Sequence, residues 1–195
     1  MSGERQVKVL YDESAIAERT EELAREIAAA KPKDLLVVAI LKGSFMFAAD
    51  LLRALHRAGL EPQVEFFHLS SYLSGTVSSG TVKILRDIES SVRDRDVLLV
   101  DDILESGRTL AFAKDLLAAR GARRVLVCTM LEKPGKRVVE IGADFVGFVC
   151  PDVFVVGYGM DVAHSYRELP FIGRVVTAQD ASEVEAAIPE TATRV

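Results

Sequence analysis

The chain alternates between almost purely apolar runs of strand length and segments with helical periodicity, and this alternation limits the fold more than any other feature. The run "DLLVVAIL" (34–41) is rich in β-branched residues and leucine, as is typical of a central strand covered on both faces. Helices are expected at 13–30, 44–55 and 107–120, and strands at 34–41, 62–72, 96–100 and 123–131. These spacings predict an α/β fold, a doubly wound parallel sheet flanked by helices.

Two regions depart from this pattern. Gly and Ser crowd the segment 73–83, which predicts an exposed loop. Residues 140–177 contain short apolar runs separated by Pro, Gly and charged turns, which favours antiparallel strands. We therefore expect one domain over residues 1–195, in which the N-terminal strand and residues 140–177 form a small hood or flap over the core.

Composition argues against several classes of protein. The net charge of −5 makes a nucleic-acid partner unexpected, because affinity for a phosphate backbone comes from clustered Lys and Arg. No apolar run approaches the roughly 18 residues of a membrane helix, and the N-terminal residues lack the layout of a signal peptide. We therefore expect a cytoplasmic protein with no membrane partner. Cys128 and Cys150 lie in apolar runs and are expected to be buried free thiols.

The segment Glu-Ser-Gly-Arg-Thr (105–109) lies between an expected strand and the start of an expected helix. The first N–H groups of a helix lack partners within it, and the helix dipole favours an anion at that end. Ser106 and Thr109 add hydroxyl donors, and Gly107 lets the backbone approach a ligand closely. Taken alone, the segment also fits an ordinary capped helix. It is a candidate phosphate site.

Three carboxylates crowd this turn: Asp101, Asp102 and Glu105. Carboxylates repel a phosphate unless they serve another partner, and the adjacent Asp101 and Asp102 can accept hydrogen bonds from a vicinal diol or hold hydrated Mg²⁺. A phosphorylated ribose offers both. The nucleotide-binding pattern G-x-x-x-x-G-K-[ST] is absent from the sequence. A response-regulator receiver also has acids at strand ends, but that fold would leave the hood and the phosphate turn unexplained.

The stretch "VLLVDDILESGRTL" (97–110) resembles the diphosphoribosyl-binding signature of the type I phosphoribosyltransferases. Three further stretches resemble hypoxanthine-guanine phosphoribosyltransferases of the bacterial type: "AILKGSFMFAADLLR" (39–53), "SSYLSGTVSSGTVKI" (70–84) and "PDVFVVGYGMDVAHSYRELPFIG" (151–173). The resemblance covers about residues 7–177. It implies a purine salvage reaction that depends on Mg²⁺. In this reaction 5-phosphoribosyl diphosphate (PRPP) and hypoxanthine or guanine give IMP or GMP and diphosphate.

The same resemblance implies how PRPP is held. The 5′-phosphate would be bound by Glu105, Ser106, Gly107, Arg108 and Thr109. Asp101 and Asp102 would hold the ribose hydroxyls and Mg²⁺, directly or through water. The diphosphate would be bound by Lys42, Gly43 and Arg167, with a second Mg²⁺ at Asp161. In the family the Lys42-Gly43 segment presents backbone N–H groups, and its peptide is often cis.

The purine would meet a second set of residues. Phe154 would stack on the ring, the backbone at Val155 would read the ring edge, and Lys133 would donate to the 6-oxo group. Asp161 belongs to this purine-binding set as well. The catalytic residue is expected to be Glu105, the general base near purine N7. Ser71 and Tyr72 would begin a loop that closes over the transition state and excludes water.

Two positions depart from the family pattern. The family usually has Glu-Asp where this chain has Asp101-Asp102, and Asp where this chain has Glu105. Both changes keep the charge and alter the reach of the side chain by one methylene. A displacement of roughly 1 Å can lower a rate by about 10²-fold, so both positions bear on turnover.

Two alternative functions stay open. Asp101-Asp102 and Gly107-Arg108-Thr109 also resemble the pyrimidine-operon attenuator proteins, RNA-binding regulators that share this fold. The motif from Pro151 to Gly173 and the lack of an evident basic face argue against that function. A phosphoribosyltransferase that prefers xanthine would differ only in its base pocket. For a phosphoribosyltransferase of either base preference, the family resemblance implies a homodimer or homotetramer.

Overall fold

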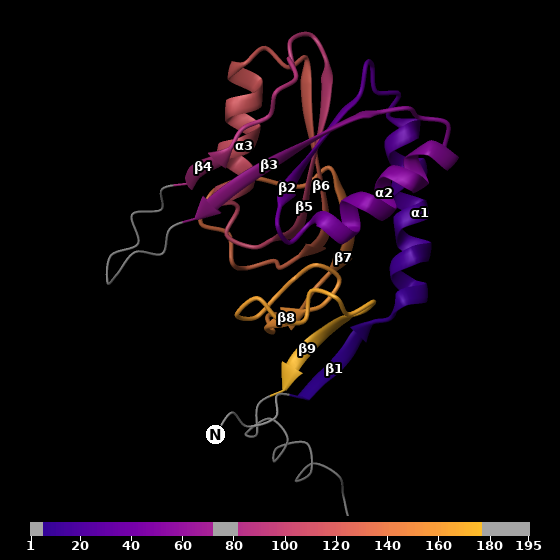
Figure 1. Cartoon of the computed structure of the whole chain (residues 1–195), viewed down its shortest axis with the longest axis vertical. Coiled ribbons are helices and arrows are strands. Elements are labelled where there is room, and N and C mark those ends of the chain that lie inside the picture. The colour runs from indigo at the N-terminus through magenta and orange to yellow at the C-terminus, as the bar shows by residue number, and fades with distance from the viewer. Residues whose placement is uncertain (1–5, 72–81, 177–195) are drawn as a thin grey trace, which may run out of the picture.

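The computed structural model describes residues 6–71 and 82–176. Six strands form the main sheet: β2 (Leu36–Leu41), β3 (Gln63–Ser71), β4 (Val82–Arg86), β5 (Asp96–Leu104), β6 (Arg124–Glu132) and β7 (Phe145–Val149). Their order is β4-β3-β2-β5-β6-β7, and every neighbouring pair is parallel except β3 and β4 (Figure 1). The predicted α/β fold is confirmed, with one antiparallel strand added at an edge of the sheet.

Three helices cover the two faces of this sheet: α1 (Glu13–Ala29), α2 (Phe45–Arg57) and α3 (Arg108–Ala119). Helices α1 and α2 lie on one face and α3 on the other (Figure 1). Along β2, Val37 and Ala39 belong to the core cluster under α1 and α2, whereas Val38 and Ile40 belong to the cluster under α3. Because alternate residues of a strand face opposite sides, burial on both faces explains the unbroken apolar run.

A separate antiparallel sheet forms the hood, and it consists of β1 (Gln6–Tyr11), β9 (Ile172–Val176) and β8 (Val155–Val156) in that order. Figure 1 shows it below the main sheet, joined to α1 by the end of β1. The prediction that the apolar run 144–150 belongs to the hood is wrong, because β7 pairs in parallel with β6. Arg19 of α1 explains this placement, since its guanidinium donates to the carbonyls of Val146 (2.8 Å) and Gly147 (3.0 Å).

Two element boundaries differ from the sequence prediction. The strand expected at 96–100 continues to Leu104, because Asp101 and Leu104 still pair with Thr129 and Glu132 of β6. Asp101 and Asp102 are thus carried by β5, whereas Glu105 follows it in the turn. Most of the loop expected at 73–83 lies outside the described residues, and its last two positions belong to β4.

Both cysteines are buried and free, as predicted. Burial raises the pKa of the Cys128 thiol well above its usual value, which makes it an inert core residue. In the part of the chain that the structure describes, no helix is both long and apolar enough to cross a membrane.

Asp96 anchors the start of β5, where its side chain is fully buried. Its Oδ2 accepts hydrogen bonds from the backbone N–H of Lys33 (2.9 Å) and from Arg124 (2.9 Å), and it also pairs with Arg123. Burial by itself raises the pKa of this carboxyl, but the Lys33 hydrogen bond and the two guanidinium groups outweigh it and lower the pKa. The charged carboxylate therefore stabilises the junction of β5 and β6.

Asp96→Asn is expected to lower the free energy of unfolding by about 2 kcal/mol at neutral pH. Because the folded-state pKa lies below the unfolded value of about 4, this contribution is present above pH 4 and is lost as the pH falls through the folded-state pKa. Urea unfolding at pH 7 and at pH 3 measures the difference. Asp115→Asn, a change at an exposed acid on α3, is the control and should leave stability unchanged at both pH values.

Candidate active site

A pocket of about 290 Å³ opens at the carboxyl ends of β2 and β5, and it contains most of the predicted PRPP residues. Its lining includes Gly43, Asp101, Asp102, Glu105, Ser106, Gly107 and Thr109. Ligands of open α/β sheets bind at this end of the strands. The main sheet therefore brings together segments that are about 60 residues apart in the sequence.

The turn between β5 and α3 presents unpaired N–H groups to this pocket. Gly107 is the N-cap of α3 and adopts a left-handed conformation (φ 82°), which glycine reaches without a steric penalty. The carbonyl of Ser106 accepts hydrogen bonds from Val138 N (3.0 Å) and Val139 N (3.3 Å). Within residues 6–71 and 82–176, the N–H groups of Ser106 and Gly107 have no acceptor. The turn is thus suited to bind an anion through its backbone.

Arg137 holds the back of the same turn, and sequence reasoning missed it. Its guanidinium donates to the carbonyls of Leu104 (2.8 Å) and Glu105 (2.6 Å) and to the carbonyl of Ile141 (3.2 Å). It also pairs with Glu132. These bonds satisfy the carbonyl side of the turn, so that the N–H side can face a ligand. The surrounding residues 133–141 have no periodicity that could have marked this arginine.

Asp101, which is buried, and the half-buried Asp102 form an acid pair in the lining of the pocket. Asp101 Oδ1 accepts from the N–H of Asp102 (3.0 Å), and Asp102 Oδ1 accepts from the N–H of Ile103 (2.9 Å). Burial raises the pKa of both carboxyls, and the neighbouring Asp102 charge raises that of Asp101 further. The surroundings of the pair therefore disfavour its doubly charged form.

The segment after β2 packs directly on this acid pair. The peptide bond between Leu41 and Lys42 is cis, one bond before the Lys42-Gly43 bond of the prediction. A Cβ at Gly43 would collide with the carboxylate of Asp102, so a larger residue there would displace the Asp102 side chain. The side chain of Lys42 is exposed. Gly43 therefore lies directly beside the acid pair.

Arg167, in the loop between β8 and β9, does not line this pocket but lies close enough for its charge to act on Asp102. Its Nη2 pairs with Asp161 Oδ1 (2.6 Å), and its Nη1 donates to the carbonyl of Gly159. The positive charge of Arg167 also acts on Asp102, where it partly opposes the rise in pKa caused by burial. The hood therefore contributes a cation to the acid pair of the main sheet.

The residues predicted to bind the purine are only partly brought together. Lys133 is buried, and its Nζ lies 3.3 Å from Oε1 of Glu105. Val155 is buried in β8, whereas the ring of the adjacent Phe154 is 56% exposed and open to a stacking partner. Ser71 is the last residue of β3, and the structure describes its backbone but not its side chain. Tyr72 lies outside the described residues.

The acid pair is suited to hold Mg²⁺ together with the phosphates of a bound substrate. Among the residues that the structure describes, no three Asp, Glu, His or Cys side chains form a group that could hold a metal ion. Mg²⁺, however, is commonly bound by only one or two carboxylates together with substrate phosphates and water. Asp101 and Asp102 provide such a pair, and burial raises the pKa of both carboxyls, an effect that a bound cation would oppose. Asp161 pairs with Arg167 instead.

Comparison with known proteins identifies the family. Residues 6–163 match the model of the phosphoribosyl transferase domain. The chain belongs to the phosphoribosyl transferase family. Hypoxanthine phosphoribosyltransferase of Escherichia coli K12 is 42% identical over 173 residues, which cover 87% of this chain and 96% of that protein. The bifunctional protein TilS/HprT of Listeria monocytogenes is 48% identical over 167 residues, or 85% of this chain, but this chain spans only 25% of its length.

Solved structures of phosphoribosyl transferases share the fold. Hypoxanthine phosphoribosyltransferase of Staphylococcus aureus superimposes with a TM-score of 0.81 at 40% identity, covering 87% of this chain and 91% of that one. Hypoxanthine-guanine phosphoribosyltransferase of Bacillus anthracis gives a TM-score of 0.80 at 39% identity, covering 89% and 100%. The parallel sheet flanked by helices is therefore the architecture of this family.

Proposed function

We propose that this chain is a purine salvage enzyme that transfers the 5-phosphoribosyl group of PRPP to hypoxanthine or guanine, forming IMP or GMP and diphosphate. The observation that carries the proposal is the acid pair of buried Asp101 and half-buried Asp102, next to a turn whose N–H groups at Ser106 and Gly107 have no acceptor among the described residues. This combination suits a ligand with a diol and a phosphate on one sugar. The names of the Escherichia coli and Staphylococcus aureus relatives support the same reaction.

The first task of the site is to hold the ribose 5-phosphate. The N–H groups at the start of α3 and the hydroxyls of Ser106 and Thr109 would bind the 5′-phosphate. The carboxylates of Asp101 and Asp102 would accept hydrogen bonds from the ribose hydroxyls. Both groups lie on or directly after β5, so the sugar is fixed between a strand and a helix N-terminus.

The second task is to stabilise the leaving diphosphate. Displacement at the anomeric carbon builds positive charge on the sugar and negative charge on the departing diphosphate. Bound Mg²⁺ would supply positive charge to the diphosphate oxygens. The backbone N–H groups of Lys42 and Gly43 and the guanidinium of Arg167 would bind the same group from two sides, and Asp161 would hold Arg167 or a second Mg²⁺.

The third task is to orient the purine and accept its proton. Lys133 would donate to the 6-oxo group, Phe154 would stack on the ring, and the backbone of Val155 would contact the ring edge. Glu105 would take the proton from purine N7 as general base. An ammonium that donates to a 6-oxo group favours hypoxanthine and guanine over adenine, which has an amino group there.

The test is product formation from PRPP with hypoxanthine, guanine, xanthine, adenine and uracil in parallel, each with Mg²⁺ and with a chelator. We expect IMP and GMP to form, and chelation to abolish both reactions. Product from xanthine alone would assign a different base preference to the same enzyme class. Failure of every purine would contradict the proposal, and filter binding with RNA would then test the attenuator alternative.

Assembly and location belong to the same proposal. We expect a homodimer or homotetramer that acts in the cytoplasm, with PRPP and 6-oxopurines as its partners. Sedimentation of the purified chain measures its oligomeric state.

A further inference from the structure

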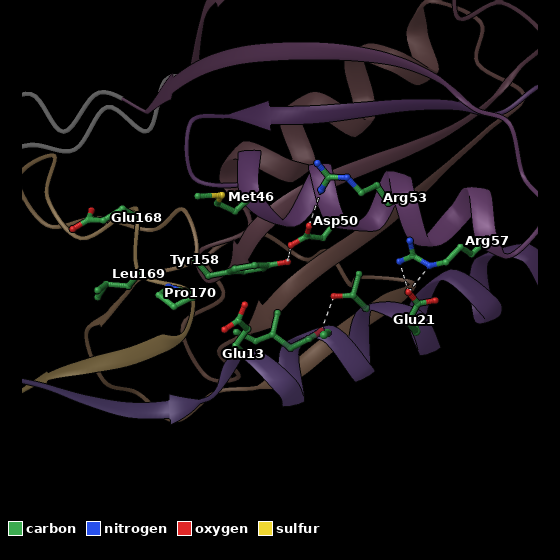
Figure 2. A pocket seen from close by; sticks show the side chains of 13 residues that line it. Glu13, Glu21, Met46, Asp50, Arg53, Arg57, Tyr158, Glu168, Leu169 and Pro170 are labelled. Carbon is green, nitrogen blue, oxygen red and sulfur yellow. Dashed lines mark hydrogen bonds and ion pairs between the residues drawn. The ribbon is translucent and has the colours of Figure 1, made fainter.

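A second cavity, of about 380 Å³, lies between α1, α2 and residues 168–170 of the hood. It shares no lining residue with the pocket of the acid pair. Figure 2 shows the ring of Tyr158 extending from the hood toward α2, where its hydroxyl meets Asp50. The hydroxyl donates to Asp50 Oδ2 at 2.8 Å, and Tyr158 as a whole is buried. A partly buried hydrogen bond therefore joins the loop after β8 to α2 outside the active-site pocket.

The backbone around Tyr158 is bound to the segment that carries Arg167. Tyr158 N donates to the carbonyl of Leu169 (2.9 Å), and Gly159 N donates to the carbonyl of Arg167 (3.0 Å). The side chain of Arg167 returns a hydrogen bond to the carbonyl of Gly159. Tyr158, Gly159 and Arg167 thus form one hydrogen-bonded unit, and a movement of Tyr158 also moves the guanidinium.

The same unit touches the diphosphate segment of the main sheet. Gly159 (φ 98°) lies so close to Gly43 that a Cβ on Gly159 would collide with the Gly43 carbonyl. Asp50 belongs to α2, the helix that begins two residues after Gly43. The adjacent residues Tyr158 and Gly159 therefore contact two points of one segment. Gly159 packs against Gly43, and Tyr158 is hydrogen-bonded to Asp50.

These two contacts lie at different points of the segment 43–50. Gly159 packs against the Gly43 carbonyl, directly before α2, whereas the Tyr158 hydroxyl binds Asp50 within α2. The loop that carries Arg167 is therefore attached to this segment at two points. Among residues 6–71 and 82–176, the bond to Asp50 is the only hydrogen bond between an α2 side chain and residues 157–169.

We propose that Tyr158 is a positioning residue, which fixes Arg167 relative to Lys42-Gly43 through its hydrogen bond to Asp50 and so sets the affinity for diphosphate. This inference rests on the proposed function, since Arg167 and Lys42-Gly43 are the groups that would bind the leaving diphosphate. Tyr158 lines the second cavity and not the pocket that contains the phosphate turn and the acid pair. The largest effect is therefore expected on the binding of diphosphate.

Tyr158→Phe keeps the ring and removes the hydroxyl. We expect the KM for PRPP and the dissociation constant of Mg²⁺-diphosphate, measured by calorimetry, to rise about tenfold, as for the loss of one hydrogen bond to a charged group. IMP has no diphosphate, so its dissociation constant should change by less than about twofold. Thermal unfolding of each variant shows whether the fold is intact.

Two further variants test the route through Asp50. Asp50→Asn keeps a side-chain oxygen that accepts from Tyr158 and should behave like the unmodified protein, whereas Asp50→Leu should reproduce the effect of Tyr158→Phe. The matched control is Tyr11→Phe, because the Tyr11 hydroxyl at the end of β1 donates to the carbonyl of Val149 at the end of β7 (3.0 Å) and so also joins the hood to the main sheet. It should leave both ligands unaffected.

The outcomes separate this inference from the function itself. Equal weakening of diphosphate and IMP by Tyr158→Phe, or an effect no larger than that of Tyr11→Phe, would overturn the positioning role. Failure of the unmodified protein to form IMP would overturn the proposed function instead, and diphosphate binding would still report on Tyr158.

Discussion

Asp101→Asn is expected to abolish phosphoribosyl transfer and yet to make the ligand-free protein more stable. Burial and the neighbouring Asp102 charge raise the pKa of Asp101, which means that its charged form is unfavourable in the folded protein. Asparagine keeps an oxygen that can accept from the N–H of Asp102, so the local hydrogen bond survives. We expect the melting temperature to rise by about 3 °C, as for a gain of about 1 kcal/mol.

The same substitution removes a carboxylate that would hold the ribose and Mg²⁺. We expect kcat/KM for PRPP to fall by about 10²-fold or more. Mg²⁺ with PRPP should raise the melting temperature of the unmodified protein but not that of Asp101→Asn, because only a ligand that binds the folded state stabilises it. Steady-state kinetics and thermal unfolding, with and without Mg²⁺ and PRPP, measure both effects.

Asp144→Asn is the matched control for this pair of effects. Asp144 also accepts a hydrogen bond from a backbone N–H, that of Val127 (2.8 Å), but it has no adjacent carboxylate and lies outside the active-site pocket. It should therefore show neither the gain in stability nor the loss of activity. A lower melting temperature for Asp101→Asn would contradict the inference that the charge of Asp101 destabilises the ligand-free protein.

The elements of the main sheet were predictable where burial leaves a local signal in the sequence. The run 34–41 is apolar throughout because β2 is covered by helices on both faces. The placement of β7 has no such local signal, since its parallel pairing with β6 is supported by Arg19 from α1, far away in the sequence. The strand β4 was missed for a similar reason, because its side chains are mostly exposed and its pairing is supplied by β3.

The candidate site divides in the same way. Asp101, Asp102 and the turn 105–109 are close in sequence, so their common chemistry is predictable from the order of the residues alone. Arg137 could not be found, because it acts only through tertiary bonds to the carbonyls of Leu104 and Glu105. The order of the residues by itself therefore finds groups that one strand and one turn bring together. Groups on separate loops, such as Arg167, were named only through the family resemblance.

Glu105 stands where the family usually has Asp, and substitutions at this position are expected to change kcat strongly. Glu105 is longer by one methylene than the Asp usual in the family, and its Oε1 lies 3.3 Å from the Nζ of buried Lys133. The proposed base is therefore paired with the residue proposed to bind the 6-oxo group. A bound purine would have to compete with this ion pair for Lys133, and the shorter Asp would leave Lys133 free for the base.

Glu105→Gln is expected to lower kcat by about 10²-fold or more, because the amide cannot accept the purine proton. Glu105→Asp keeps a carboxylate and breaks the pairing with Lys133, so its kcat should stay within about tenfold of the unmodified protein, and its KM for hypoxanthine should fall. Steady-state kinetics with hypoxanthine and PRPP measure both constants.

Glu140→Gln, at an exposed acid beyond the turn, is the control and should leave both constants unchanged. If Glu105→Gln turned over as fast as the unmodified protein, Glu105 would not be the base. If Glu105→Asp were as slow as Glu105→Gln, the length of the side chain rather than its charge would control the rate.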